Sequence, residues 1–179
     1  LSEVKFSDDS KLETIEEGAF SETVIVNFTI PPHVTKIKRS TFSACYDLQE
    51  VKTAENSELR SIEDESFNNS SITSISIPSG FAEFDRKWCF ETSCLVNVNI
   101  SPKNRNFRSY ESGLVLGKSN QDAAEFDVLV FCPRNAEKVT IPNFIKNINP
   151  YCFDLCNKLL DLDFQNDSKI EIIEDFAFV

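Results

Sequence analysis

The stretch SISIPSGFAEFDRKWCF, residues 74–90, contains the pattern that is repeated along the whole chain. Ile75 and Ile77 are two residues apart, which places both side chains on one face of an extended segment and predicts a strand. Pro78 then ends the strand, because proline has no amide hydrogen for a sheet ladder. Phe90 closes the phrase, so one unit comprises a strand, a corner and a final phenylalanine.

Phenylalanine ends the same phrase at regular intervals. The six positions are Phe20, Phe42, Phe67, Phe90, Phe153 and Phe178. Their successive spacings are 22, 25, 23, 63 and 25 residues, so the units have similar lengths and one step carries an insertion. Self-similarity at this period is typical of a solenoid of stacked coils. We therefore expect residues 1–179 to form a single repeat array in which the six rings form a buried file.

Apolar residues at strand spacing precede the phenylalanines. The segments are Leu1-x-x-Val4-x-Phe6, Ile25-x-x-Phe28-x-Ile30, Leu48-x-x-Val51, Ile72-x-x-Ile75-x-Ile77, Leu95-x-x-Val98-x-Ile100 and Leu159-x-x-Leu162-x-Phe164. We expect about seven coils, with short strands in one parallel sheet at ~4.8 Å spacing and short helical or irregular segments opposite. Neighbouring coils carry opposite or mixed charges at equivalent positions, which are Glu16-Glu17, Lys38-Arg39, Glu63-Asp64 and Asp85-Arg86. The alternation fits a surface charge ladder that favours the register of the coils, although a solvated face is the better interpretation.

Three stretches resemble the BspA-like leucine-rich-repeat family, whose repeat reads roughly L-x-x-I-x-I-P-x-x-V-x-x-I-x-x-x-A-F-x-x-C. They are SISIPSGFAEFDRKWCF, NFTIPPHVTKIKRSTFSAC (27–45) and VTIPNFIKNINPYCFDLC (139–156). The Ala-Phe step of the family is kept at Ala19-Phe20 and Ala177-Phe178 and is replaced in the other units. The resemblance implies a leucine-rich-repeat solenoid, and it implies surface proteins of bacteria and protists that contact host matrix proteins or other cells.

Residues 103–133 form the insertion, which resembles the interruption found in the same family. We predict a β-hairpin that pairs Leu114-Val115-Leu116 with residues 128–131 around a polar tip. Because binding residues are common on loops that a rigid scaffold positions, we expect this element to protrude and to contact a partner. Deletion of residues 119–125 is then expected to impair binding and to leave the fold intact.

The net charge of the chain is −11 and its isoelectric point is about 4.6. This charge excludes nucleic acid and anionic membrane surfaces as partners, since both require clustered lysine and arginine. No apolar run approaches the ~20 residues of a membrane-spanning helix, so we expect no direct membrane insertion by this segment, and no signal peptide is present in these residues. The repeat pattern is cut at both ends, so we expect a fragment of a longer solenoid.

The outward positions of the predicted strands carry small polar and charged residues, and we predict that they form the interaction surface. They are Glu3, Lys5, Glu50, Lys52, Ser74, Ser76, Asn97, Lys138, Thr140, Asp161 and Asp163. Small residues of mixed charge do not identify a ligand, so the sequence predicts a protein-binding face without naming its partner.

Glycosylation acceptor sequences occur along the chain. They are Asn27-Phe28-Thr29, Asn68-Asn69-Ser70, Asn69-Ser70-Ser71, Asn99-Ile100-Ser101 and Asn166-Asp167-Ser168, so the candidate sites include Asn69 and Asn166. Asn27 and Asn99 occupy outward strand positions. Either the sheet face binds a partner and stays unglycosylated, or glycans cover it and binding uses the edges and the insertion.

No catalytic residues, cofactor or metal site are predicted. His33, the single histidine, lies between Pro32 and Val34 in a corner turn, with no orienting partner at a recognisable offset. A calcium site would draw on the acidic residues Glu58, Glu63, Asp64 and Glu65. Their spacing matches no known calcium loop, and a solvated acidic face is the better interpretation.

The six cysteines follow the repeat. Cys45, Cys94 and Cys156 come three or four residues after a repeat phenylalanine, and Cys89 and Cys152 directly precede one. We interpret them as small buried hydrophobic residues, because no second pair follows at zinc-finger spacing. Their even number and their stacking between coils are also compatible with disulfides, whereas the family resemblance implies free thiols.

We therefore expect a non-enzymatic interaction or adhesion module of a cell-surface protein, binding host matrix or other cell-surface proteins. The alternative is an intracellular structural or scaffold repeat protein. A secretion signal or anchor in flanking sequence would favour the first, and its absence together with fully reduced thiols would favour the second.

Overall fold

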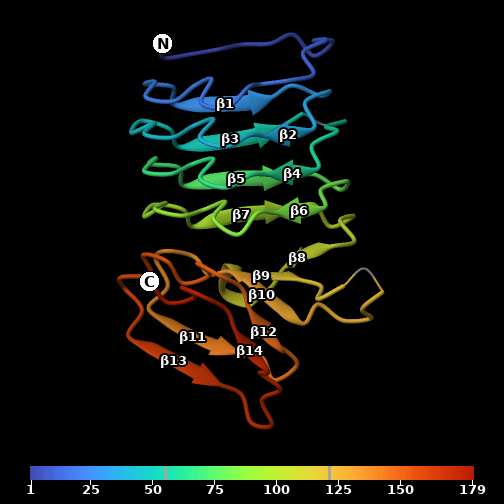
Figure 1. The fold of residues 1–179 in the computed structure, drawn as a ribbon, viewed down its shortest axis with the longest axis vertical. Helices are drawn as coiled ribbons and strands as arrows, with labels where there is room; N and C mark the ends of the chain where they lie inside the picture. Colours follow the sequence, from blue (N-terminus) through green and yellow to red (C-terminus); the bar gives the residue numbers. More distant parts are fainter. Residues whose placement is uncertain (55, 121) are drawn as a thin grey trace.

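The computed structural model describes residues 1–54, 56–120 and 122–179 of the chain. Its N-terminal part is a stack of parallel strands in the order β1-β3-β5-β7, drawn one above another in Figure 1. These strands are β1 (Asn27–Ile30), β3 (Glu50–Thr53), β5 (Ser74–Ile77) and β7 (Asn97–Ile100). Phe28 and Ile30 of β1 point inward and are buried, because successive side chains of a strand alternate between its two faces. The parallel sheet predicted from the sequence is confirmed.

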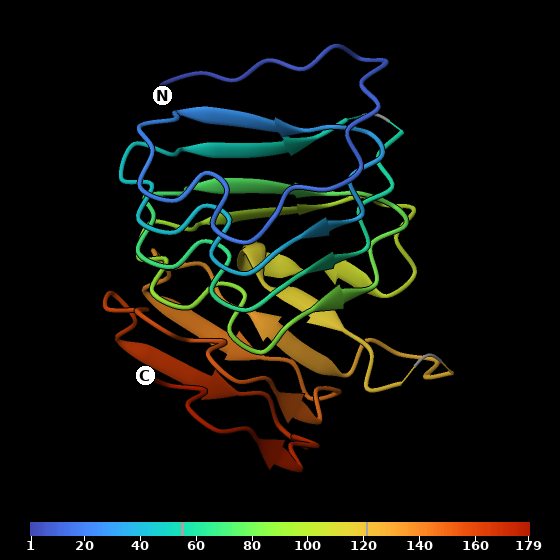
Figure 2. The same ribbon diagram turned by 45° about the horizontal axis from the view of Figure 1, so that its top comes forward.

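A second row of strands follows the corner of each coil. Its members are β2 (Lys36–Ile37), β4 (Ser61–Ile62) and β6 (Glu83–Phe84), which pair in parallel as a three-stranded sheet. The two rows enclose the core and make each unit one turn of a solenoid, as Figure 2 shows. Turns complete each coil, and within the described ranges the helical structure is limited to one 3₁₀ turn, η1 (Glu111–Gly113).

The insertion is built into the solenoid. β9 (Val115–Gly117) and β10 (Val128–Phe131) pair antiparallel where the sequence predicts a hairpin, and β8 (Phe107–Ser109) pairs antiparallel with β9. The other edge of β10 pairs in parallel with β12 (Asn147–Ile148), which pairs with β14 (Ile172–Ile173). The hairpin strands therefore continue a sheet of the solenoid, and it is the tip between β9 and β10 that projects in Figure 1.

The long strands after the insertion form a separate sheet. β11 (Lys138–Ile141) and β13 (Asp161–Phe164) pair in parallel with each other, and β11 does not pair with β7. Figure 1 shows these two strands inclined to the four above them. The antiparallel strands of the insertion interrupt the parallel ladder, so the single continuous sheet that we expected is divided.

The number of turns is about six rather than the expected seven. Outside the insertion, the described chain has six strands of four residues, β1, β3, β5, β7, β11 and β13. Residues 1–6, where the apolar spacing predicts a strand, form none. Val4 and Phe6 nevertheless pack against the core as partly buried side chains.

Phenylalanine rings stack between neighbouring coils. The ring centres of Phe20 and Phe42 are 5.7 Å apart and those of Phe42 and Phe67 are 5.6 Å apart, with interplanar angles of 10° and 3°. Phe153 and Phe178 stack in the same way at 4.7 Å. The predicted file is therefore present in two parts, one on each side of the insertion. It is buried at Phe42, Phe67 and Phe153, whereas Phe20 is partly buried and Phe178 is 47% exposed.

Phe90 does not belong to the file, and the prediction for this residue was wrong. Its ring is partly exposed and contacts the edge of Tyr151, with the ring centres 5.1 Å apart. Trp88 and Cys89 are buried in its place, and the Trp88 ring lies 5.8 Å from Phe131 of the insertion. The large indole fills the space at this level of the core, so the repeat phenylalanine turns outward.

The closing turns around Phe20, Phe42, Phe67 and Phe153 use left-handed backbone two residues before and two residues after the phenylalanine, whereas the turn at Phe90 uses it at Glu91. Around Phe42 these residues are Ser40 (φ 54°) and Ala44 (φ 53°). Equivalent residues in other coils are Gly18, Glu22, Glu65, Asn69, Tyr151 and Leu155. Since a side chain in this conformation costs roughly 1–2 kcal/mol, contacts between coils must hold the turns in place. One such contact is the hydrogen bond that the Phe42 amide donates to the Ser66 carbonyl at 2.8 Å.

Ion pairs link neighbouring coils, consistent with the surface charge ladder. Lys38 contacts Glu16 at 2.6 Å, and Arg39 contacts Glu65 at 2.6 Å. Arg86 instead reaches the last coil, where it lies 3.4 Å from Asp175. Exposed pairs of this kind contribute about 0–1 kcal/mol each, so they assist the register of the coils more than they stabilise the fold.

We expect Phe42→Ala to lower the free energy of unfolding by about 3–5 kcal/mol, because the ring is fully buried between two stacked neighbours. Phe90→Ala is the matched control and should cost markedly less, since its ring is partly exposed. Chemical denaturation monitored by circular dichroism measures both. Equal losses for the two variants would contradict the interrupted file.

Candidate interaction surface

The outward side chains of the four-stranded sheet fall in two columns, which the parallel register fixes. One column contains Asn27, Glu50, Ser74 and Asn97, and the other contains Thr29, Lys52, Ser76 and Asn99. The sequence-predicted residues Glu50, Lys52, Ser74, Ser76 and Asn97 are therefore neighbours on one face. This surface is named the strand face.

Polar groups on the strand face are largely paired with one another. Asn99 donates from Nδ2 to Ser74 Oγ at 3.1 Å, and Lys52 contacts Glu50 at 2.9 Å. Ser76 Oγ accepts a hydrogen bond from the Thr53 amide at 2.9 Å. The face offers small, mutually satisfied polar groups, which suit a partner held by weak polar contacts.

The other predicted surface residues lie apart from the strand face. Glu3 and Lys5 contact each other at 2.9 Å on the N-terminal segment, which is not a strand. Lys138 lies 3.2 Å from both Asp161 and Asp163 on the β11–β13 sheet. Thr140 is exposed on the same inclined sheet. The interaction surface predicted as continuous is therefore divided into separate patches.

The candidate glycosylation asparagines reach solvent. Asn27 and Asn99 are exposed on β1 and β7, at opposite edges of the strand face. Asn69 is exposed in a left-handed turn, and Asn166 is exposed in the turn after β13. A glycan on any of the four would project outward from the solenoid.

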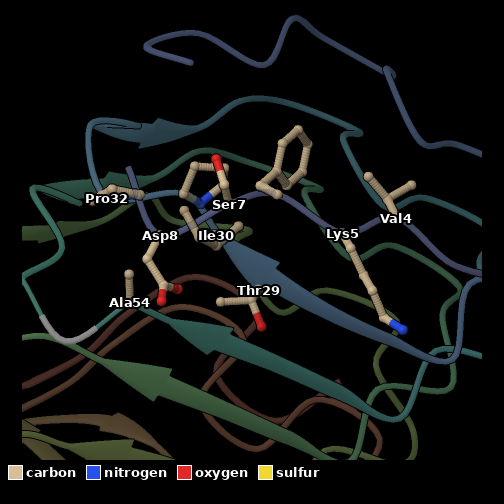
Figure 3. Close-up of a pocket in the computed structure, with 10 residues that line it drawn as sticks. Val4, Lys5, Ser7, Asp8, Thr29, Ile30, Pro32 and Ala54 are labelled. Atoms are coloured by element: carbon tan, nitrogen blue, oxygen red, sulfur yellow. The ribbon is translucent and has the colours of Figure 1, made fainter. Parts of the chain in front are cut away.

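Recesses lie where the long strands end in their corners. One of about 240 Å³ is enclosed by the N-terminal segment and the end of β1, with Asp8, Thr29 and Ala54 in its lining (Figure 3). Lys5 also lines it and extends away from the other labelled side chains. A more open recess of about 570 Å³ follows the ends of β5 and β7. Both are shallow features of the Ile-Pro corner.

A cluster of aromatic rings around one arginine lies beside the tip of the insertion. The guanidinium carbon of Arg108 is 4.8 Å from the ring centre of Phe126, 5.7 Å from Tyr110 and 5.8 Å from Phe144. The ammonium of Lys118 lies 5.4 Å from the Phe126 ring. Arg108, Phe126 and Phe144 line a recess of about 280 Å³ together with Ala124 and Glu125. We name Arg108 and the rings of Tyr110, Phe126 and Phe144 the aromatic–arginine cluster.

The sequence did not identify this cluster, although it directed attention to the insertion. Arg108 and Tyr110 are two residues apart, and in an extended segment this spacing places both side chains on the same face. That spacing was the one signal in the sequence that could have indicated part of the cluster. Phe144 follows Pro142 in the next coil, and no local pattern connects it to Arg108. The cluster forms because the hairpin is paired to the coil that contains Phe144. The rings of Tyr110, Phe126 and Phe144 lie at the margin of the core that the insertion and the following coils share.

The repeat pattern and the coil geometry have a counterpart among known families. A model described as "BspA type Leucine rich repeat region" matches the chain in 6 copies, over residues 1–111 and 121–179. The chain belongs to the BspA-type leucine-rich repeat family. No curated protein matches the chain. The family and the leucine-rich-repeat solenoid that the sequence resemblance implies are confirmed by this match and by the fold.

Solved structures of bacterial leucine-rich repeat proteins share the fold of this BspA-type array. A leucine-rich cell surface protein from Faecalibacterium prausnitzii has 22% identity and a TM-score of 0.62, over 84% of this chain and 41% of its own length. The pneumococcal vaccine antigen PcpA has 21% identity and a TM-score of 0.71, over 84% and 39%. A protein from Eubacterium ventriosum has 17% identity and a TM-score of 0.55, over 86% and 51%. The chain thus spans about half or less of these proteins.

His33 has a partner that sequence reasoning missed. Its Nδ1 atom lies 3.1 Å from Glu58 Oε1, 25 residues away, and both side chains are exposed. The acidic residues considered for calcium face different groups, since Glu63 contacts Lys36 and Glu65 contacts Arg39. In the part of the chain that the structure describes, no three metal-ligating side chains gather as an ion site would require.

The described part of the BspA-type array has no helix with the length and apolar character needed to cross a bilayer.

Asp127 holds the tip of the insertion against the next coil. Its buried carboxylate accepts hydrogen bonds from the Ser119 amide at 2.9 Å and from Ser119 Oγ at 3.0 Å, and Lys146 Nζ lies 3.5 Å away. Burial raises the pKa of Asp127, but the hydrogen bonds from Ser119 outweigh burial, so the pKa lies below its ordinary value. Ser119 is therefore part of the support of the hairpin. Deletion of residues 119–125, of which residue 121 lies outside the described residues, would remove this support along with the tip.

We expect Asp127→Asn to destabilise the hairpin by about 1–3 kcal/mol at neutral pH, because a charged acceptor of two hydrogen bonds is lost. The pKa of the Asp127 carboxyl is lower in the folded chain than in the unfolded chain. Its contribution to stability is therefore fully present at a pH above the unfolded-state pKa, and it is lost as the pH falls through the folded-state pKa. The difference from wild type should therefore shrink in acid. Hydrogen exchange at the Ser119 amide measures the effect. Asp122→Asn, a change at an exposed residue of the same tip, is the control, and an equal effect there would contradict the role of Asp127.

Proposed function

We propose that this BspA-type array is a protein-interaction module displayed at the cell surface, and that the aromatic–arginine cluster of the insertion is its main contact. The observation that carries the proposal is one exposed guanidinium set among three half-buried rings beside the projecting tip. Arginine and aromatic side chains are enriched at the energetically dominant positions of protein interfaces.

The charge of the insertion supports the choice of this region. Lys103, Arg105, Arg108 and Lys118 lie within sixteen residues that contain one acidic side chain, Glu111, although the whole chain has a net charge of −11. A partner that offers a carboxylate beside an apolar side chain would complement Arg108 and the rings around it. The strand face lacks such a feature, since its charges are already paired.

Location outside the cell is supported by the family and by the names of two structural neighbours, a "leucine rich cell surface protein" and a "vaccine antigen". Adhesion to host matrix or to another cell is the specific function that we propose for such a module. Glycans at Asn27 or Asn99, where used, would cover the strand face and leave the insertion accessible. An intracellular scaffold is the competing function.

We expect Arg108→Ala to weaken binding to a protein partner roughly tenfold or more, because it removes the centre of the contact. Arg105→Ala is the matched control, since it removes the same charge from an exposed position of the same insertion, and it should change affinity by about twofold at most. A panel of matrix proteins tested by surface plasmon resonance supplies the partner. Equal losses of affinity for both variants would indicate that the insertion contributes only its overall positive charge, and they would contradict the proposed site.

The location is tested on intact cells that produce the native protein. We expect antibodies against the repeat array to label unpermeabilised cells, and external protease to remove that label. Labelling that appears only after permeabilisation would contradict surface display and would favour the intracellular scaffold.

A further inference from the structure

A buried arginine joins the three parts of the molecule. Arg134 follows the insertion and is 3% exposed. Its Nη1 atom donates to the carbonyl oxygens of Cys132 at 3.1 Å and Cys152 at 2.8 Å. Its Nη2 atom donates to Cys89 Sγ at 3.2 Å, and Cys156 Sγ lies 3.6 Å from Nη1. One guanidinium therefore contacts residues of the coils before the insertion (the first stack), of the insertion itself, and of the coils after it (the second stack).

The thiols of Cys132 and Cys156 are neighbours within this cluster. Cys132 Sγ lies 3.7 Å from the Pro133 carbonyl oxygen, and Cys156 Sγ lies 3.8 Å from the same oxygen. Cys156 Sγ is also 3.9 Å from the Cys132 carbonyl oxygen. The Cys132 amide donates to the Cys152 carbonyl at 3.1 Å, so the ends of the insertion and of the next coil are held together by backbone as well.

The surroundings distinguish Cys156 from the other thiols. A hydrogen bond from Cys132 lowers the pKa of the Cys156 thiol against the effect of burial, and the guanidinium of Arg134 lowers it further. Burial raises the pKa of the Cys89 and Cys152 thiols. Cys156 is also half-buried, whereas Cys89, Cys132 and Cys152 are buried. It is therefore the thiol of the cluster that combines access to solvent with thiolate character.

We propose that Cys156 and Cys132 are a redox pair that closes to a disulfide when the protein meets a peroxide. The Cys156 thiolate attacks one peroxide oxygen, the O–O bond breaks, and the departing oxygen leaves as water after protonation. The Cys156 sulfenic acid is then attacked by the Cys132 sulfur, the S–O bond breaks, and a second water leaves. Two thiols lose two electrons in total and hydrogen peroxide gains them.

The site is distinct from the proposed contact surface and does not depend on it. The disulfide would join the end of β10 to the coil that follows β12, across the boundary where the parallel sheet is divided. A cross-link limits the conformations of the unfolded chain, so oxidation should stabilise the second stack against the insertion. The guanidinium of Arg134 lies 3.2 Å from Cys89 Sγ and 3.6 Å from Cys156 Sγ, and its positive charge opposes a metal cation there.

The test uses the whole chain. Reduced protein is treated with hydrogen peroxide, remaining thiols are blocked with N-ethylmaleimide, and tryptic peptides are analysed without reduction. We expect peptide 119–134, which contains Cys132, to be linked to peptide 147–158, which contains Cys152 and Cys156. The link should disappear in Cys156→Ser and persist in Cys152→Ser. A link that persists in Cys156→Ser, or no link at all, would overturn the proposal.

A second measurement establishes the order of the steps. In Cys132→Ser, peroxide should leave Cys156 as a sulfenic acid that dimedone traps, because its partner is missing. Cys94→Ser is the control, since Cys94 is exposed outside the cluster, and oxidation of that variant should still raise the melting temperature by roughly 5–10 °C. Dimedone labelling of Cys132 in place of Cys156, or an unchanged melting temperature, would contradict the assignment.

Discussion

Contact between equivalent residues of successive coils is the interaction on which this molecule depends. A coil does not bury its apolar residues alone, so the inward side chains of an internal coil are covered by the coils on either side of it. The stacked rings of Phe20, Phe42 and Phe67 show this relation most directly. The same dependence explains why left-handed backbone at Ser40 and Ala44 is tolerated, since hydrogen bonds between coils fix the turns.

The insertion uses this dependence and also interrupts it. β10 of the insertion pairs in parallel with β12, the first short strand of the coils that follow. The insertion therefore covers the end of those coils and takes the place of a coil in the stack. Its other strands run antiparallel, so the long-strand ladder stops at β7 and resumes as β11 and β13. Two side chains fill the junction between the insertion and the neighbouring coils. Trp88 packs beside Phe131, and Arg134 donates hydrogen bonds to the carbonyl oxygens of Cys132 and Cys152. The aromatic–arginine cluster beside the projecting tip is a product of the same junction.

Much of the fold could be predicted from the sequence, because repetition reveals it. Inward residues such as Phe28, Ile75 and Val98 are set by spacing alone, and the parallel sheet follows from their recurrence. The outward position of Phe90 could not be predicted in this way, because it depends on the volume of Trp88 beside Phe131 from a distant segment. The partnership of His33 with Glu58 likewise arises from stacking of two corners and has no local signal. For the candidate site, the sequence indicated the insertion and the outward face, but the meeting of Arg108 with Phe144 required the pairing of the hairpin.

The inclination of the β11–β13 sheet to the four strands above it, visible in Figure 1, limits the shape of any ligand that touches both. The columns of outward side chains on β1 to β7 therefore do not continue in line onto Lys138 and Asp161. A ligand that contacted both sheets would meet two sets of strands with different directions. The change of direction would thus restrict which ligands can contact both sheets, independently of the chemistry of the residues that line them.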